Sequence, residues 1–271
     1  MAASRRLVLV TGAASGIGRA LAMAAAAEGE DLLLLDKDGP ELERLSNALS
    51  QYDSDVTCCE LDITDRAQVE AAMRPIKRLD VAYLNAGIFA GGNMLGEHGQ
   101  IDTLDPDVWH RVIDVNLHGF FNTLQVSTSI MKSAGTGSIV VTASTSGMRA
   151  EPLASYPYVA SKAAVIALVR QAALELAGFG VRINAFAPGP VRTNISGSNG
   201  MDPTKQATWD NTIPIGRFAE PDELVPLARL LAAPESSYIT GSIMVADGGA
   251  GSLTQVPASA LPSADIGSRF R

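Results

Sequence analysis

Short, continuous apolar runs recur along this chain and alternate with longer segments of helical spacing. Six such runs are Leu7–Val10, Leu32–Leu35, Val81–Leu84, Ile139–Thr142, Val181–Ala187 and Ile243–Ala246, and Val56–Leu61 supplies a seventh strand. Runs that are apolar throughout are typical of strands covered on both faces of a parallel sheet. Helices are expected between them, at Gly18–Glu28, Glu41–Ser50, Arg66–Ile76, Val108–Lys132, Tyr158–Ala177 and Asp222–Ala232. The pattern predicts an α/β fold, a doubly wound, mostly parallel seven-stranded sheet with helices on both faces in a single domain.

The composition excludes several classes of protein. Of the 271 residues, 46% are hydrophobic and 18% are charged, which is too apolar for an intrinsically disordered chain. The formal net charge of −8 provides no basic field for nucleic acid or for an anionic membrane. The apolar run after Arg5 and Arg6 is shorter than the core of a signal peptide, and no later run is long enough to span a membrane. Cys58 and Cys59 form no disulfide framework, so we expect a soluble, cytoplasmic protein.

A glycine-rich turn follows the first predicted strand directly and opens the first helix. It reads Thr11-Gly12-Ala13-Ala14-Ser15-Gly16-Ile17-Gly18. Glycines permit a tight turn and let backbone N–H groups approach a pyrophosphate at a helix N-terminus, where the helix dipole favours anions. Glycine clusters also occur in ordinary turns, but the position between strand and helix favours dinucleotide binding.

Asp36 lies at the end of the second predicted strand, eighteen residues after Gly18. A carboxylate at this place can accept both hydroxyls of an adenosine ribose and repels the 2′-phosphate of NADP, so it favours NAD as the cofactor. The alternative is a turn or helix-capping aspartate before Gly39 and Pro40, and the spacing favours the cofactor role.

Two long loops interrupt the alternation. Residues 87–99 are rich in glycine after the fourth strand in chain order, and residues 188–211 carry proline, glycine, serine and asparagine after the sixth. Ligands of open α/β sheets bind beyond the carboxyl ends of the strands, where both loops emerge. We therefore interpret residues 87–99 and 193–212 as substrate loops, with Phe89, Met94, Met201 and Trp209 as a mixed lining, although ordinary surface loops remain the alternative.

At these residues the chain resembles the short-chain dehydrogenase/reductase family. The further family motifs are Asn85-Ala86-Gly87, Asn116, Ser144 with Gly147, Tyr158-x-x-x-Lys162, Pro188-Gly189-Pro190-Val191-Arg192-Thr193 and Asp247-Gly248-Gly249. The resemblance covers residues 6–249, and it implies a single Rossmann-like oxidoreductase domain over residues 1–249. It further implies cofactor contacts at Gly12, Ser15, Gly16, Ile17, Gly18, Asp36, Asp62, Ile63, Asn85, Ala86, Gly87, Tyr158, Lys162, Pro188, Gly189, Val191 and Thr193. For Asp62, a capping role before Thr64-Asp65 is an equal alternative.

Tyr158 and Lys162 have a spacing of i and i+4, so both project from one helix face. A free phenol has a pKa of about 10 and is a poor base at neutral pH. A neighbouring ammonium and a positive nicotinamide ring favour the phenolate, and we expect them to lower the pKa of Tyr158 to ~7. Tyr158 is therefore predicted to exchange a proton with the substrate hydroxyl while hydride passes to or from the cofactor.

Ser144 and Asn116 complete the predicted catalytic set. The Ser144 hydroxyl follows the fifth strand, where it can bond the reacting oxygen; Thr145 and Ser146 compete for this role, and strand-end capping is the alternative. Asn116 interrupts an apolar helical segment in which asparagine is a poor helix former. The family resemblance implies that Asn116 holds a water that links Lys162 to solvent.

No metal site is predicted. His98, His110 and His118 have no ligand spacing with one another or with the cysteines, and we interpret Cys58 and Cys59 as inert core thiols.

The predicted function is an NAD-dependent oxidoreductase that interconverts a secondary alcohol and a ketone, with a polyol, sugar, cyclic alcohol or dihydrodiol as substrate. The alternatives are a 3-oxoacyl-(acyl carrier protein) reductase that uses NADPH and a non-catalytic dinucleotide-sensing protein. The family resemblance implies a homotetramer, or else a homodimer. Residues 250–271 form a C-terminal tail, which we expect either to pack on a neighbouring subunit or to fray.

Overall fold

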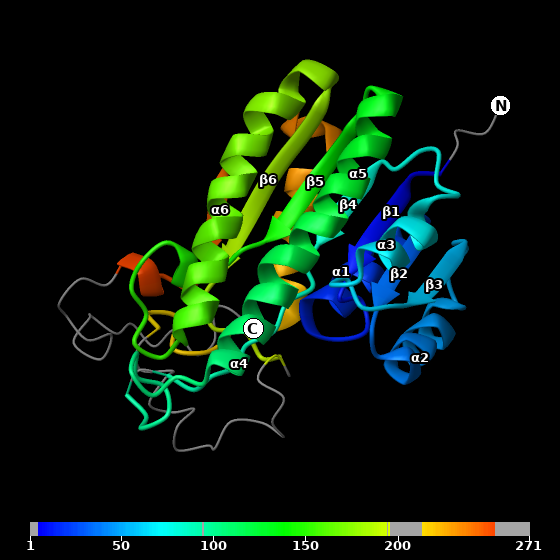
Figure 1. The fold of residues 1–271 in the computed structure, drawn as a ribbon. Helices are drawn as coiled ribbons and strands as arrows, with labels where there is room; N and C mark the ends of the chain where they lie inside the picture. The colour runs from blue at the N-terminus through cyan, green and yellow to red at the C-terminus, as the bar shows by residue number, and fades with distance from the viewer. Residues whose placement is uncertain (1–4, 94, 194, 196–212, 253–271) are drawn as a thin grey trace.

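A computed structural model describes residues 5–93, 95–193, 195 and 213–252. It contains a seven-stranded sheet in the order β3-β2-β1-β4-β5-β6-β7 (Figure 1). The strands are β1 (Leu7–Thr11), β2 (Asp31–Asp36), β3 (Val56–Glu60), β4 (Val81–Leu84), β5 (Gly137–Thr142), β6 (Val181–Pro188) and β7 (Ile243–Ala246). Every neighbouring pair is parallel, so the predicted doubly wound sheet is confirmed. The strand order reverses between β1 and β4, and in such sheets ligands bind beyond the carboxyl ends at the point of reversal.

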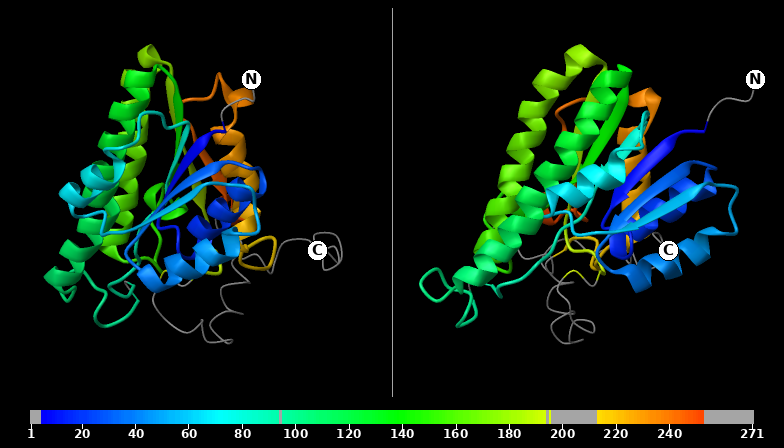
Figure 2. Two further views of the ribbon diagram at one scale, coloured as in Figure 1. Left: turned by 90° about the vertical axis from the view of Figure 1, so that its right-hand side faces the viewer. Right: turned by 45° about the vertical axis from the view of Figure 1, so that its right-hand side comes forward.

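Helices cover both faces of the sheet (Figure 2). One face packs against α1 (Gly16–Ala27), α2 (Gly39–Leu49) and α8 (Val225–Ala232), and the other against α3 (Arg66–Met73), α5 (Phe120–Ala134) and α6 (Tyr156–Leu176). Along β1, Val8 and Val10 belong to the core on the first of these faces and Leu9 to the core on the second. Alternate side chains of a strand point to opposite faces, and with both faces covered every position must be apolar. This packing explains the unbroken apolar runs.

The predicted helix over residues 108–132 is in fact three elements. They are α4 (Pro106–Ile113), a π-helical segment over Asp114–Gly119, and α5. A π-helical segment inserts an extra residue into the helical ladder and is frequent at functional sites. The segment contains Asn116, the residue whose poor helix propensity stood out in the sequence. The short 3₁₀ helices are Thr145–Gly147, Ala177–Phe179, Pro221–Leu224, Pro234–Ser236 and Ala250–Ser252.

The two edge strands are less buried than their sequences suggested. Strand β3 lies at one edge of the sheet, where Cys58 is exposed and Cys59 is half-buried. The interpretation as a core thiol is therefore wrong for Cys58, whereas Cys59 packs against the core from a half-buried position. Strand β7, at the opposite edge, is also only partly buried.

No helix among the described residues is long and apolar enough to cross a membrane.

Candidate active site

The glycine turn after β1 adopts a conformation that residues with a side chain cannot readily adopt. Gly12 and Gly16 have φ angles of 65° and 51°, in the left-handed region. A Cβ atom on Gly18 would lie 1.9 Å from the carbonyl oxygen of Gly12, so α1 packs directly on the turn. Ser15 precedes α1 and makes no side-chain capping hydrogen bond to it. The first N–H groups of α1 thus lack a side-chain cap, which fits an anion such as a pyrophosphate.

Asn85 holds this turn from the end of β4. Its side-chain NH₂ donates to the carbonyl oxygens of Thr11 (3.2 Å) and Gly12 (3.3 Å), and its Oδ1 accepts a hydrogen bond from the Thr142 hydroxyl. The Thr11 hydroxyl in turn accepts from the backbone N–H groups of Asn85 and Ala86. The side chain of Asn85 therefore ties β1, β4 and β5 together, while its predicted cofactor contact stays a prediction.

The Asp36 carboxylate lies against the glycine turn. Its Oδ2 accepts a hydrogen bond of 2.9 Å from the Ala14 N–H, and its Oδ1 accepts one from the Asp38 N–H. The hydrogen bond from Asp38 gives Asp36 the turn role that was the alternative to cofactor binding. Asp36 does not cap α2, because the N-cap of that helix is Asp38. The bond to Ala14 fixes a carboxylate at the start of the predicted dinucleotide site.

Lys162 is a buried cation on α6. The residue is only 4% exposed, and its Nζ donates a 2.8 Å hydrogen bond to the backbone carbonyl of Thr142. Burial lowers the pKa of Lys162 to about 8. The same Nζ lies 5.8 Å from the centroid of the Tyr158 ring.

Tyr158 lies close enough to Ser144 for the Ser144 hydroxyl to affect its pKa. Burial raises the pKa of Tyr158, and the Ser144 hydroxyl lowers it by less. The expected value of ~7 includes the charge of a bound nicotinamide ring and stays a prediction; in the protein alone, desolvation of the phenolate dominates. Ser144 also accepts a 3.2 Å hydrogen bond from the Ser146 N–H.

Asn116 clamps the loop that follows β4. Its Oδ1 accepts a 2.7 Å hydrogen bond from the Ile88 N–H, and its Nδ2 donates to the Ile88 carbonyl (2.9 Å) and to the Ser161 hydroxyl (3.2 Å). A Cβ on Gly87 would lie 3.2 Å from Oδ1 of Asn116 and 3.6 Å from Nζ of Lys162. The structure thus brings Asn116, Gly87 and Lys162 together, while the water link through Asn116 stays a prediction.

Phe89 was predicted only as part of a mixed loop lining, yet it contacts the central tyrosine. The rings of Phe89 and Tyr158 meet edge to face, with centroids 5.0 Å apart. The Phe89 N–H donates a 3.4 Å hydrogen bond to the carbonyl oxygen of Ile195. An aromatic residue in a glycine-rich loop gives no periodic signal, so the sequence could not indicate this contact.

The remaining predicted positions surround the same end of the sheet. The Thr193 methyl group lies 3.0 Å from where a Cβ on Gly16 would be, so the segment after β6 reaches the glycine turn. Val191 forms a parallel bridge with Ala219, and a Cβ on Gly189 would clash with Asp247. Elsewhere, Ile63 is buried, and Asp62 accepts hydrogen bonds from the Thr64 N–H and hydroxyl in a local turn, whereas the cap of α3 is Asp65. Residue 94 and residues 196–212, with Met201 and Trp209, lie outside the described residues, as does the tail beyond residue 252.

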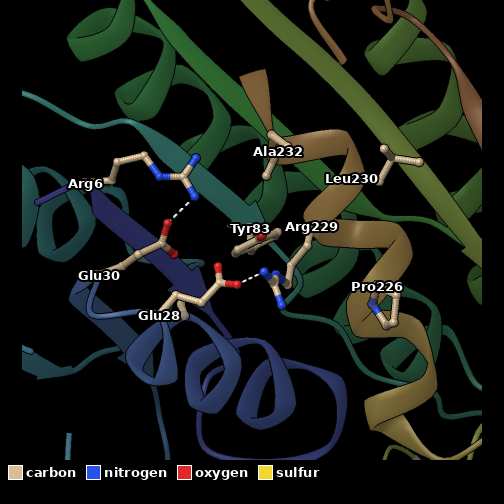
Figure 3. Close-up of a pocket in the computed structure, with 10 residues that line it drawn as sticks. Arg6, Glu28, Glu30, Tyr83, Pro226, Arg229, Leu230 and Ala232 are labelled. Atoms are coloured by element: carbon tan, nitrogen blue, oxygen red, sulfur yellow. Dashed lines mark hydrogen bonds and ion pairs between the residues drawn. The ribbon is translucent and has the colours of Figure 1, made fainter. Parts of the chain in front are cut away.

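Two cavities lie elsewhere. One, of about 350 Å³, is at the amino ends of β1 and β2 and is crossed by the ion pairs Arg6–Glu30 and Arg229–Glu28 (Figure 3). The other, of about 580 Å³, is an open hollow lined by residues 91–93, 96–99, 103–105 and 108. Within the described ranges no three His, Cys, Asp or Glu side chains gather into a possible metal site.

Comparisons with known proteins give a consistent result. A family model described as enoyl-(acyl carrier protein) reductase matches residues 12–251. The 3-oxoacyl-[acyl-carrier-protein] reductase FabG of Thermotoga maritima is 35% identical over 248 residues, which cover 90% of this chain and 97% of the relative. Galactitol 2-dehydrogenase of Agrobacterium fabrum is 34% identical over 263 residues, covering 92% and 98%.

Solved structures of reductases also match this chain over most of its length. The crystal structure of levodione reductase matches with a TM-score of 0.84 and 31% identity, covering 92% of this chain and 98% of that one. A 3-oxoacyl-[acyl-carrier protein] reductase from Brucella melitensis with bound NAD matches with a TM-score of 0.80 and 32% identity, covering 91% of each chain.

Proposed function

Because the chain belongs to the short-chain dehydrogenase/reductase family, we propose that it is an NAD-dependent oxidoreductase that interconverts a secondary alcohol and a ketone. The observation that carries the proposal is the meeting of Tyr158, Ser144 and Lys162 beyond the carboxyl ends of β4, β5 and β6. The glycine turn, with an uncapped α1 behind it, fits the pyrophosphate of a dinucleotide. A bound nicotinamide would accept or supply the hydride.

The side chains divide the proton chemistry between them. The Ser144 hydroxyl lies near Tyr158 and can donate to a substrate oxygen placed between them. The Tyr158 hydroxyl takes the proton of an alcohol or returns one to a ketone. The pKa of Tyr158 is raised in the protein alone, so its ionisation requires added positive charge. Lys162, held by the Thr142 carbonyl, lies 5.8 Å from the Tyr158 ring, and the positive nicotinamide ring of NAD⁺ would add the further charge.

Asp36 supports NAD over NADP. Its carboxylate is fixed by Ala14 at the glycine turn, where a 2′-phosphate would meet a like charge. The alternative, a 3-oxoacyl-(acyl carrier protein) reductase using NADPH, has a relative of that name among the comparisons. A protein of that name has also been solved with NAD bound, so the name alone does not decide the cofactor. The non-catalytic alternative is disfavoured because Asn116, Ser144, Tyr158 and Lys162 are all present.

A homotetramer is part of the proposal. Helices α5 and α6 expose Phe121 and Leu174, and Leu174 is 79% exposed. Exposed apolar side chains of this kind are typical of surfaces buried by a second subunit. A cytoplasmic location and a subunit contact made by the tail stay predictions from the sequence.

The test is NADH formation from a panel of secondary alcohols with NAD⁺ or NADP⁺. The proposal expects steady turnover with NAD⁺ on at least one alcohol. Turnover only with NADPH and a 3-oxoacyl thioester would favour the alternative. Tight NADH binding without any turnover would favour the sensing protein.

A further inference from the structure

Apolar side chains follow three neighbouring strands where these strands end. Phe89 comes after β4, Met148 after β5 and Ile195 after β6. Met148 is 47% exposed and Ile195 is 43% exposed, while Phe89 is half-buried. The carboxyl ends of parallel strands lie at one edge of the sheet, where Phe89 contacts Tyr158 and the Ile195 carbonyl bonds the Phe89 N–H. We call these three residues the apolar rim.

Within the apolar rim, Phe89 is held by two contacts, one of its ring and one of its backbone. Its ring meets the ring of Tyr158 edge to face at 5.0 Å, and its N–H bonds the Ile195 carbonyl. Edge-to-face pairs have a preferred geometry, so the contact restricts both rings. Phe89 therefore joins the loop after β4 to the loop after β6 at the position of the proton-handling hydroxyl.

Several polar side chains of the described residues at this end of the sheet are already bonded within the protein. Both ends of the Asn116 amide are used by Ile88 and Ser161. The Thr145 hydroxyl donates to the Pro188 carbonyl, and Arg149 donates to the Ala250 carbonyl. A substrate with many hydroxyl groups would lose water here without gaining these groups as partners, which is costly.

We propose that Phe89 determines specificity and selects secondary alcohols whose carbinol carbon carries an apolar ring or alkyl group over open-chain polyols. The inference rests on the proposed oxidoreductase function. The ring of Phe89 provides a fixed apolar wall beside Tyr158, and Met148 and Ile195 extend it. Along this wall a polyol chain would exchange the hydration of its hydroxyl groups for contact with apolar side chains.

The experiment compares cyclohexanol with galactitol as substrates at saturating NAD⁺. The wild-type protein is expected to favour cyclohexanol in kcat/KM by about tenfold or more. Phe89→Asn should reduce that preference by about tenfold, chiefly through cyclohexanol, whereas Phe89→Leu should keep most of it because the wall stays apolar. Tyr238→Asn, which changes a fully exposed aromatic residue, is the matched control and should leave the ratio unchanged.

The ratio of the two substrates separates specificity from a structural role, since a damaged fold lowers both rates together. NADH affinity, measured by fluorescence, should be the same in all four proteins. A wild-type preference for galactitol, or an unchanged ratio in Phe89→Asn with NADH affinity retained, would overturn the inference and leave the proposed function standing. Absence of NADH formation from every secondary alcohol tried would instead overturn the proposed function, and the inference with it.

Discussion

The two ends of the sheet differ in whether their buried charged side chains have a partner of opposite charge. At the amino end, Glu30 is 8% exposed and is paired with Arg6, and Glu28 is paired with Arg229 across α1 and α8 (Figure 3). At the carboxyl end, Lys162 is more buried still, yet among the described residues no carboxylate pairs with it. Burial is the cause of its lowered pKa, and its hydrogen bond goes to a neutral carbonyl.

This difference indicates at which end of the sheet the protein loses folding stability in order to keep a group that acts in catalysis. Paired charges tie elements together and leave little net field. An unpaired buried ammonium is unfavourable for folding, and it provides a positive field for an anion that forms only during reaction. The amino end is therefore interpreted as structural and the carboxyl end as catalytic. Substitutions at the two ends should then have unequal effects on turnover and opposite effects on stability.

Lys162→Met should lower kcat by about 10²- to 10³-fold, because the ammonium that favours the Tyr158 phenolate is lost. The affinity for NADH should also fall, since the family resemblance places this ammonium on the nicotinamide ribose. Glu30→Gln, at the other end, should change kcat by less than about twofold. Steady-state kinetics and NADH fluorescence titration measure both effects, and equal losses in the two variants would remove the contrast.

Because of Asp36, kcat/KM with NAD⁺ should exceed kcat/KM with NADP⁺ by about two orders of magnitude. A phosphate placed against this carboxylate costs several kcal/mol, and each ~1.4 kcal/mol is a factor of ten. Asp36→Ser should narrow the gap mainly by weakening the use of NAD⁺. Asp38→Ser is the matched control, because serine can still cap α2. Equal use of both cofactors by the wild-type protein would show that Asp36 has no role in the choice.

Lys162→Met should raise the free energy of unfolding at pH 7, whereas Glu30→Gln should lower it by about 1–2 kcal/mol. The pKa of Lys162 is about 8 in the folded protein, below the ordinary lysine value of 10.5, so the folded state binds fewer protons than the unfolded chain between these values. Its charge therefore destabilises the fold below pH 8, by up to about 3 kcal/mol, and this cost is relieved as the pH rises toward 10.

Urea unfolding at pH 7 and at pH 9.5 checks the sign. The advantage of Lys162→Met over the wild-type protein should shrink at the higher pH. A variant that is less stable than the wild-type protein at pH 7 would contradict the idea of an uncompensated charge.

Much of the fold could be predicted from the sequence, because strands covered on both faces must be apolar at every position. The edges of the sheet could not be predicted, because the sequence of Val56–Leu61 does not indicate that this strand lacks a neighbour on one side. Cys58 is accordingly exposed. The poor helix propensity of Asn116 indicated an irregularity within its helix. The π-helical segment itself follows from packing against Ile88 and Ser161, which are distant in sequence.

The candidate site divides in the same way. Spacing predicted Tyr158 and Lys162, since both stand on one helix face. It did not indicate Phe89, Thr11 or Thr142, whose contacts come from segments brought together only by the sheet order. The sequence also does not contain the burial that raises the pKa of Tyr158 in the protein without cofactor.

The most direct test compares two tyrosines, the half-buried Tyr158 at the carboxyl end of the sheet and the buried Tyr83 at the amino-end cavity. Burial raises the pKa of both Tyr158 and Tyr83, and Tyr83 lines the amino-end cavity. The kcat of Tyr158→Phe and of Tyr83→Phe would be measured with NAD⁺ and the best secondary alcohol. The account predicts a loss of about 10³-fold or more for Tyr158→Phe with unchanged NADH affinity, and a change within about twofold for Tyr83→Phe. Turnover by Tyr158→Phe close to that of the wild-type protein would contradict the claim that the carboxyl end is the catalytic centre.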